Sequence, residues 1–438
     1  MNFLEKCKNV RREIEKMERP LVVGHYDSDG ISSTAIVLLG LRDMGKEFSV
    51  KTVRKLGEKE LGEISEDEII FVDLGSGVLD LLGKTGRRIV VIDHHQRKGD
   101  GIGVIEANPH EFGIDGGKEL SAAGVAYRVF GDAKMSHLAV VGAVGDMQHP
   151  LRGMNRVILE EGQRAGLIEI KRDLTLYGRF NRPLAELLCY STSHYFPGLT
   201  EDVEACRDFI EMLGIEQKRE KWRRYVDLSM DEKVRFVTAL VKHLYAHGLD
   251  EKARELVGEV YEFPNEPEET RDANEFSTLL NACGRNKKPE IGIRLCMGDE
   301  KARNEARAIL RIYRKKLREG IEFAVSSTEE RDAYYIIDGR GKIEDGIIGV
   351  IAGMMYKQDK PVIGLAYDDE GNVKVSARAS SEVVKRGVNL GRIMVEACEG
   401  IGNGGGHKMA AGASVKKENL EAFMRRLDEA LGAFGLWT

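Results

Sequence analysis

Short apolar runs alternate with helix-like patterns through the first half of the chain. The runs LVVGH, EIIFVDLG and RRIVVIDHH are each followed by a helical pattern, in order SSTAIVLLGLRDM, VLDLLGKTG and AAGVAYRVF. This alternation predicts a parallel β-sheet with helices on its faces, which is the α/β class. Ligands bind at the carboxyl ends of the strands in such sheets, so the residues that follow each run are the first candidates for a site.

Acidic residues occupy these strand ends. Asp27 and Asp29 follow the first run, Asp73 the second and Asp93 the third. The run HLAVVGAVGDMQ is interpreted as a fourth unit of the same kind and places Asp146 at its end. An ionised carboxylate beside a buried strand is costly unless it is paired or binds a metal, and clustered oxygen ligands suit hard divalent cations. A single aspartate is also explained as a helix cap, but the repetition favours a metal site.

Histidines accompany the acidic residues. His25 precedes Asp27 by two residues and adds a nitrogen ligand, and His94 and His95 directly follow Asp93. Side chains of adjacent residues diverge, so we expect one histidine of the pair to bind a metal and the other to face a substrate.

Strand signals nearly vanish between residues 197 and 325. In DEKVRFVTALVKHLYAHG the apolar residues Val234, Val237, Val241 and Leu244 repeat at helical spacing. DEKARELVGEVY predicts a second amphipathic helix, and DEKARNEARAILRIYRKKLREG predicts a long connector helix. We interpret residues 231–261 as a protein-docking or oligomerisation element, with packing on the chain itself as the equal alternative.

Strands return in the last part of the chain, in AYYIIDG, KPVIGLAYD and NVKVSARAS, with helices in GIIGVIAGMMYK and ENLEAFMRRLDEALG. These patterns predict a smaller C-terminal α/β domain. The expected domains are therefore 1–200, a helical segment 201–325, and 326–438.

The segment Gly402-Asn403-Gly404-Gly405-Gly406-His407 in this last domain is rich in glycine. Glycines let backbone amides approach an anion closely, and an imidazole adds a donor. The segment is interpreted as an anion-binding nest, with an ordinary loop as the alternative.

Composition excludes several classes of protein. The net charge of −6 gives no global sign of nucleic-acid binding, so any such surface must be local. The six cysteines lack CxxC spacing, which argues against a zinc ribbon or a disulfide framework and favours buried thiols. An apolar run of about 18 residues is absent, as is a secretory signal, so we expect a cytoplasmic protein without a membrane span.

The motifs resemble those of the DHH phosphoesterases, a family named for the triplet Asp93-His94-His95. The resemblance implies a metal-dependent phosphodiesterase that uses two manganese ions, with magnesium as the alternative. It implies that His25, Asp27 and Asp73 bind one ion, that Asp73 bridges to the second, and that the second site is completed by Asp29, His94 and Asp146.

The C-terminal segment resembles the GGGH signature of the DHH-associated module, DHHA1, and the wider pattern resembles archaeal RecJ-like exonucleases. By this resemblance the catalytic residues are Asp73, Asp93, His95 and His407. The segment FSTLLNACGR also resembles RecJ-type exonucleases. The implied substrate-binding residues are Asn281, Arg285, Ser376, Arg378, Gly404, Gly405, Gly406 and His407.

The resemblance implies a single-strand-specific exonuclease for DNA or RNA that acts in archaeal replication or repair. The spelling GHYDSDGISST is nearer to Hef-associated 3′→5′ members than to GINS-associated ones, which favours 3′→5′ cleavage. The resemblance also implies a replication or repair partner of the Hef or GINS type that binds through the middle helices, and a homo-oligomer is the other expected assembly. Two other classes share these features. One is a phosphodiesterase for short oligonucleotides or cyclic dinucleotides, and the other is a noncatalytic scaffold related to a subunit of the eukaryotic replicative helicase. A type II pyrophosphatase would lack the GGGH module.

Overall fold

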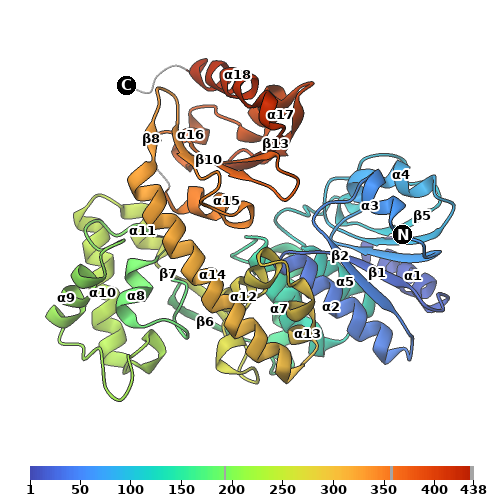
Figure 1. Cartoon of the computed structure of the whole chain (residues 1–438). Helices are drawn as coiled ribbons and strands as arrows, with labels where there is room; N and C mark the ends of the chain where they lie inside the picture. The colour runs from blue at the N-terminus through green and yellow to red at the C-terminus, as the bar shows by residue number, and fades with distance from the viewer. Residues whose placement is uncertain (192–193, 356–358, 435–438) are drawn as a thin grey trace. The chain divides into compact units, whose positions relative to one another are not determined.

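The computed structural model describes residues 1–191, 194–355 and 359–434 of the 438-residue chain (Figure 1). The chain forms two compact units, Met1–Ile309 and Leu310–Thr438. Most of the helical segment expected as a separate domain therefore belongs to the same compact unit as the N-terminal sheet.

A five-stranded sheet organises the N-terminal part of the first unit. Its strand order is β2-β1-β3-β4-β5, and every neighbouring pair is parallel. The predicted parallel sheet of an α/β fold is confirmed, although two of its strands, β2 and β5, are absent from the sequence prediction. The strands are β1 (Leu21–His25), β2 (Ser49–Val53), β3 (Glu68–Val72), β4 (Arg88–Ile92) and β5 (Val104–Ala107).

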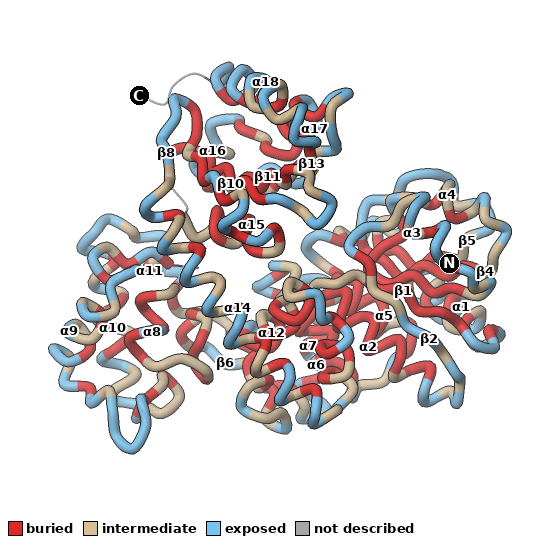
Figure 2. The backbone as a smooth tube through the Cα atoms, viewed as in Figure 1, coloured by how far each residue is buried: buried red, intermediate tan, exposed pale blue. Residues whose placement is uncertain are grey.

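Helices cover this sheet and bury its apolar strands, which appear as continuous buried tube in Figure 2. Helix α2 is the centre of the packing, because it contacts β1, α5 and α6. The helices are α1 (Phe3–Glu15), α2 (Ser28–Asp43), α3 (Glu58–Gly62), α4 (Leu79–Gly83), α5 (Ala122–Phe130), α6 (Ser136–Gly145) and α7 (Gly153–Arg164).

Two sequence predictions in this region are wrong. The apolar run before Asp146 is helix α6 and not a strand, because its small residues let it pack among α2, α5 and α7 on several sides. A short apolar run can belong to a buried helix or to a buried strand, and periodicity does not separate them. Helix α2 also begins at Ser28 and not at Ser32, because the side chain of Asp27 caps it.

The middle of the chain packs on itself. Its helices are α8 (Leu184–Cys189), α9 (Val203–Met212), α10 (Met230–Ala246) and α11 (Asp250–Glu255). Strands β6 (Glu169–Leu174) and β7 (Val257–Glu262) precede and follow these helices and pair as an antiparallel two-stranded sheet. The second predicted amphipathic helix is therefore wrong beyond Glu255, where the chain becomes β7.

Helix α10 does not present the predicted stripe as one continuous surface. Phe236, Leu240 and Leu244 are fully buried in a core shared with α8 and α9, with Val237 and Val241 packed against it, whereas Val234 is exposed. The apolar side of α10 is thus covered by α8 and α9 of the same chain. This arrangement agrees with the alternative prediction, in which the helix packs on its own chain.

Three further helices complete the first unit and lead to the second. They are α12 (Ala273–Arg285), α13 (Pro289–Cys296) and the long α14 (Glu300–Ser327), which contains the boundary between the units. The predicted connector helix is confirmed. The short 3₁₀ helices of the first unit are η1 (Ser76–Val78), η2 (Pro109–Phe112), η3 (Ala133–Met135), η4 (Tyr225–Asp227) and η5 (Glu268–Thr270).

The second unit is a six-stranded mixed sheet with the strand order β12-β13-β11-β10-β9-β8. Its strands are β8 (Glu329–Glu330), β9 (Tyr335–Asp338), β10 (Val362–Tyr367), β11 (Val373–Arg378), β12 (Gly402–Gly406) and β13 (Ala410–Val415). Its helices are α15 (Asp345–Met354), α16 (Ser381–Lys385), α17 (Leu390–Cys398), η6 (Lys417–Asn419) and α18 (Leu420–Gly432). The predicted small α/β domain is confirmed, while Tyr356 and Lys357 of its first predicted helix lie outside the described residues.

The glycine-rich segment is a strand and not a loop. β12 pairs with β13 in an antiparallel register, and α17 packs on it. A Cβ atom on Gly404 would lie 2.2 Å from the carbonyl oxygen of Met394, so this glycine is required by the close helix above it. A Cβ atom on Gly405 would meet open space.

All six cysteines are buried free thiols, as the sequence predicts. Among the described residues, no helix is both long enough and apolar enough to cross a membrane.

Candidate metal centre

Side chains from the ends of three parallel strands and from α2 and α6 meet at the carboxyl edge of the N-terminal sheet. Their nitrogen and carboxylate oxygen atoms form three groups, each with all ligand atoms within 4.8 Å of one another. Asp73 and His94 each belong to two groups. The groups are His25, Asp27 and Asp73; Asp29, His94 and Asp146; and Asp73, Asp93, His94 and His95.

Asp73 lies between two histidines. Its Oδ2 atom is 3.3 Å from Nδ1 of His25, and its Oδ1 atom is 3.3 Å from Nε2 of His94. The backbone of Asp73 has a φ of 61°, in the left-handed region that is costly for a residue with a side chain. Its amide donates to the carbonyl of Ile92, which anchors the residue at the β3 and β4 strand ends. One oxygen of this carboxylate therefore faces each half of the cluster.

The ring of His94 is held in a defined orientation. Its Nδ1 atom donates to the carbonyl oxygen of Gly116 at 2.7 Å, which directs Nε2 into the cluster. Burial disfavours the charged ring, but Asp73, Asp146 and Asp29 together raise the pKa of His94 well above its usual value. Nε2 lies 3.3 Å from Asp73 and 3.7 Å from both Asp29 and Asp146. Within the described residues this buried nitrogen has no hydrogen-bond partner. An imidazole nitrogen that faces three carboxylates is placed to bind a cation among them, which would take the place of the proton on this nitrogen.

Asp29 is oriented by the first turn of another helix. The amides of Ala122 and Ala123, at the start of α5, donate to its two oxygens at 2.7 and 2.9 Å. Gly142 of α6 makes room for it, because a Cβ atom there would lie 2.3 Å from Asp29 Oδ1. Burial and the charge of Asp73 nevertheless raise the pKa of Asp29 well above its usual value.

Asp93 positions the histidine pair and does not reach outward. It is fully buried and accepts from the amides of Ser76, His94 and His95. It also holds Nδ1 of His95 at 2.8 Å. Burial lowers the pKa of His95, but Asp93 outweighs this effect and raises it to about 9. The ring of His95 is more than half exposed, whereas that of His94 points into the cluster.

His25 and Asp27 form the other half of the cluster. Nδ1 of His25 is 3.0 Å from Asp27, and the amide of Gly30 donates to Asp27 as the cap of α2. Asp27 is thus both a helix cap and a candidate ligand. Burial disfavours a charged His25, but Asp27 and Asp73 together raise its pKa well above the usual value.

The protein groups fit a pair of cations. Five carboxylates and three histidines gather here, and the buried atoms His25 Nδ1, Asp73 Oδ1 and His94 Nε2 lack hydrogen-bond partners within the described residues. Three of these carboxylates, Asp29, Asp73 and Asp93, are buried, and carboxylates this close repel one another unless positive charge lies among them. Mixed oxygen and imidazole ligands suit manganese, and magnesium is accommodated through the carboxylates.

Gln148 is a site residue that the sequence prediction missed. Its amide donates to Asp146 Oδ2 at 3.1 Å and to the carbonyl of Gly116 at 2.8 Å, and its own oxygen accepts from Asn155. Gln148 therefore links Asp146 to the carbonyl of Gly116, the group that also orients His94. Its position two residues after Asp146 was the available signal, but its contact with Gly116, 32 residues away, depends on the tertiary structure.

Asn281, predicted to bind substrate, contacts the backbone between the candidate ligands Asp27 and Asp29. Its Oδ1 atom accepts from the amide of Ser28 at 3.1 Å, at the start of α2. Gly284 lets α12 come this close, because a Cβ atom there would lie 1.8 Å from the carbonyl oxygen of Tyr26. Arg285, the other predicted substrate residue of this segment, is the last residue of α12.

The remaining predicted residues belong to the second unit. Ser376 and Arg378 lie on β11, where Gly349 of α15 leaves space for both side chains. His407 follows β12, and its amide donates to Ala410, the residue paired with Arg378. Arg378 and His407 are thus at the same end of this sheet. Gly404, Gly405 and Gly406 form β12 itself.

Family models match three parts of the chain. The model of the DHH family N-terminal domain matches residues 19–145, the DHH-CID domain matches 176–257 and the DHHA1 domain matches 332–433. An uncharacterized protein of Methanocaldococcus jannaschii is 32% identical over 98% of this chain and 99% of its own length. The chain belongs to the DHH family. The predicted family, with its DHH and DHHA1 domains, is confirmed.

This DHH protein is also related to RecJ. It is 23% identical to the single-stranded-DNA-specific exonuclease RecJ of Bacillus subtilis, over 97% of this chain and 47% of that relative. The chain thus spans about half the length of this RecJ.

Solved structures show the same fold. RecJ of Thermus thermophilus in complex with Mn²⁺ has a TM-score of 0.60 at 19% identity, covering 98% of this chain and 55% of that one. CDC45 of Entamoeba histolytica has a TM-score of 0.65 at 16% identity and covers 98% of both chains.

Proposed function

We propose that this DHH protein hydrolyses phosphodiester bonds with two divalent cations, manganese before magnesium, and removes nucleotides from an end of single-stranded DNA or RNA. The observation that carries the proposal is the carboxylate of Asp73, which turns one oxygen toward His25 and the other toward His94. His25, Asp27 and Asp73 would hold one cation, and Asp29, Asp73, His94 and Asp146 the other. Two such cations supply an activated water and neutralise charge on the attacked phosphate.

The protein's own groups would then bind and orient the phosphate. His95 presents an exposed ring held by Asp93, and a donor in this position stabilises charge on a nonbridging oxygen. Arg378 and His407, at one end of the second sheet, are proposed to bind a phosphate of the substrate. The RecJ relatives support single-stranded nucleic acid as the substrate.

The test uses the full chain, a His94→Asn variant and a His247→Asn control. His247 is an exposed histidine that ends α10, away from the cluster. After chelation, manganese binding is measured by calorimetry, and hydrolysis is followed on DNA and RNA strands labelled at each end in turn. We expect wild type and the control to bind manganese and to shorten the strands, and His94→Asn to lose both properties.

The results of this test distinguish the proposed function from its alternatives. Undiminished hydrolysis after exhaustive chelation contradicts the metal proposal. Strand binding without manganese binding or hydrolysis indicates the scaffold function that the CDC45 fold suggests. Cleavage restricted to dinucleotides indicates the small-nucleotide phosphodiesterase. Retention of the 5′ label during stepwise shortening supports the expected 3′→5′ polarity.

A further inference from the structure

His95 lies in the segment that follows β4, and its ring and its backbone have different partners. Asp93 holds the exposed ring through Nδ1 at 2.8 Å. The carbonyl oxygen of His95 accepts from Nδ2 of Asn108 at 2.9 Å. Asn108 directly follows β5 and lies beside Asp93, because Ile92 of β4 pairs with Ala107 of β5. One neighbour therefore fixes the ring of His95, and another fixes its backbone.

Asn108 is fully buried, and both ends of its side-chain amide are hydrogen-bonded. Nδ2 also donates to the hydroxyl of Ser76 at 2.9 Å and lies 3.3 Å from Glu106. Oδ1 accepts from the amide of His110 at 2.9 Å and so caps η2. The two protons of Nδ2 thus have acceptors in two different segments, at Ser76 and His95, which sets the direction of the amide.

The partners of Asn108 are themselves held in a buried network. The hydroxyl of Ser76 donates to Glu106 at 2.5 Å, and the other oxygen of Glu106 accepts from Nε of Arg97 at 2.7 Å. The amide of Ser76 donates to Asp93 at 3.0 Å. The network therefore reaches His95 through its carbonyl and through the carboxylate that holds its ring. A satisfied buried network of this kind rigidifies the groups that it joins.

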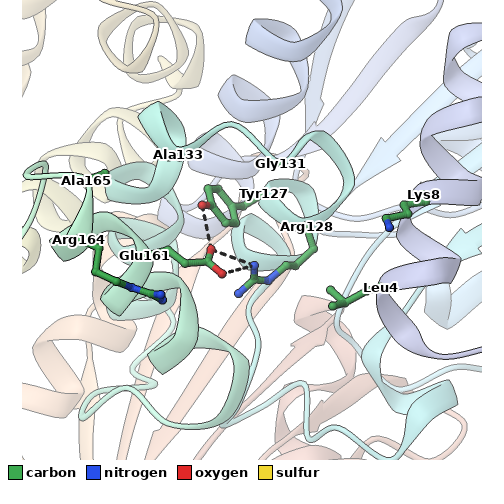
Figure 3. Close-up of a pocket in the computed structure, with 9 residues that line it drawn as sticks. All are labelled: Leu4, Lys8, Tyr127, Arg128, Gly131, Ala133, Glu161, Arg164 and Ala165. Atoms are coloured by element: carbon green, nitrogen blue, oxygen red, sulfur yellow. Dashed lines mark hydrogen bonds and ion pairs between the residues drawn. The ribbon is translucent and has the colours of Figure 1, made fainter.

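A second network, away from the metal centre, joins two helices. Arg128 of α5 donates to both oxygens of Glu161 of α7 at 2.9 Å, and the hydroxyl of Tyr127 donates to the same carboxylate at 3.0 Å (Figure 3). It lies at the end of α5 opposite to the turn that holds Asp29. These bonds join one helix to another, whereas those of Asn108 end on a residue proposed to contact substrate. The second network therefore supplies a control for the loss of a partly buried hydrogen bond.

We propose that Asn108 is a positioning residue, which fixes the backbone of His95 so that the ring held by Asp93 faces the attacked phosphate. The inference rests on the proposed function for the role of His95. A donor stabilises charge on a reacting oxygen only when it is held within about 0.5 Å of the productive position, which requires support for both ring and backbone. Manganese binding should not depend on Asn108, because the adjacent ligand His94 is held separately by the carbonyl of Gly116.

The first experiment compares Asn108→Ser with wild type in the full chain. Serine can still cap η2 but has no amide to reach His95, so a residue that acted only as a cap would tolerate the change. We expect manganese affinity near that of wild type and a fall in kcat of about ten- to a hundredfold with little change in KM. Two controls should retain wild-type turnover: Asn2→Ser, the same substitution at the exposed cap of α1, and Tyr127→Phe in the second network.

A double-mutant cycle with His95→Ala tests whether Asn108 acts through His95. In the His95→Ala background, Asn108→Ser should cause no further loss of turnover, because the residue that it positions is absent. Ser76→Ala is a milder second variant, which keeps the amide bound to Asp93 and removes the hydroxyl bound to Asn108. It should show a smaller loss that also disappears in the His95→Ala background.

The last measurement needs no activity. In chelated protein with ¹⁵N-labelled histidine, NMR detects the Nδ1 proton of His95, which is assigned by its absence from His95→Ala. It should exchange with water at least about tenfold faster in Asn108→Ser and at the wild-type rate in both controls. A wild-type protein without hydrolysis would contradict the proposed function, and the exchange rate would still decide the inference. The inference is overturned by unchanged exchange, by absence of this proton from the wild-type spectrum, or by equal losses of turnover with and without His95.

Discussion

At the scale of single residues, the candidate metal centre depends on side chains in which two polar atoms have different partners. His94 donates from Nδ1 to a carbonyl and directs Nε2 at carboxylates, and Asp73 faces a histidine with each of its oxygens. Such a group cannot be replaced by a neighbour, because its second contact fixes the direction of the first.

Asp73→Ala is expected to abolish turnover and manganese binding, because it removes the carboxylate that lies between both halves of the cluster. His407→Ala should instead keep its manganese and lose about a hundred- to a thousandfold in rate, the usual effect of removing one donor to a charged oxygen. Elemental analysis of bound manganese and turnover on one labelled strand measure both effects. Unchanged turnover in His407→Ala would show that the second unit does not contribute to the active site.

Asn281→Leu tests a positioning role. The substitution removes the oxygen that accepts from the amide of Ser28 at the start of α2. Because Ser28 lies between Asp27 and Asp29, we expect weaker manganese binding and about ten- to a hundredfold slower turnover. The control is Asn274→Leu, an exposed position on the same helix, which should leave both quantities unchanged. Calorimetric manganese titration separates this role from substrate binding, because a residue that contacts substrate alone would change the Michaelis constant and leave the metal affinity intact.

At the scale of elements, close helix packing brings the candidate metal ligands together. Helix α6 carries Asp146 at its end and approaches Asp29 of α2 through Gly142, and α5 holds the same aspartate with its first amides. Three helices therefore determine the position of one carboxylate. A substitution that alters the packing of these three helices should therefore change the affinity of the cluster for manganese.

Gly142→Ala is expected to weaken manganese binding and to lower the free energy of unfolding by about 1 to 3 kcal/mol, the typical cost of overpacking. The added methyl would lie 2.3 Å from Asp29 Oδ1 and 2.5 Å from the Cβ atom of Ala123. Gly432→Ala in α18 is the matched control, because a Cβ atom there meets open space. It should be neutral or stabilising in urea denaturation. Equal effects of the two substitutions would contradict the packing argument.

The ion pair between Arg223 and Glu232 should make the stability of the middle region depend on pH. Hydrogen bonds from the buried Arg223 outweigh partial desolvation and lower the pKa of Glu232 to about 2. A carboxyl whose pKa is lower in the folded state stabilises the protein fully above its unfolded value, near 4.5, and loses this contribution as the pH falls toward 2.

Glu232→Gln should therefore cost about 1 to 3 kcal/mol at pH 7 and progressively less below pH 4.5. Urea denaturation of both proteins at several pH values measures the difference. A difference that stays constant with pH would contradict the ion-pair explanation, since a packing effect does not titrate.

At the scale of the whole molecule, the chain consists of two units with separate cores and a net charge of −6. An acidic protein binds a nucleic-acid strand through local groups of cations, and each contacted phosphate releases counterions. The affinity for long strands should therefore fall steeply with salt although the protein as a whole is acidic.

A plot of log affinity against log salt concentration for a labelled single strand should have a slope of about −0.7 for each contacted phosphate. Fluorescence anisotropy with a chelated, noncleaving protein measures it. A dinucleotide should show a much smaller slope, because it offers fewer phosphates. A flat response for the long strand would favour the small-nucleotide phosphodiesterase.

The sequence by itself determined three strands of the N-terminal sheet and the positions of several candidate ligands. The period of apolar residues indicated β1, β3 and β4, and the parallel sheet places Asp27, Asp73 and Asp93 at one edge whatever surrounds them. The small C-terminal α/β domain followed from the same local periodicity in β9, β10 and β11, whereas β8, β12 and β13 were not predicted as strands. These features depend on neighbours in the chain, and such information is contained in short stretches of sequence.

Only the tertiary structure decided what holds the ligands in place. Asp29 is bound by the amides of Ala122 and Ala123, and Ser28 by Asn281, through contacts between residues 93, 94 and 253 positions apart. Backbone amides have no signature in the sequence, because every residue except proline carries one. Which of them lies beside a given carboxylate is set by how the helices pack, and packing depends on the whole core and not on any short stretch of the chain.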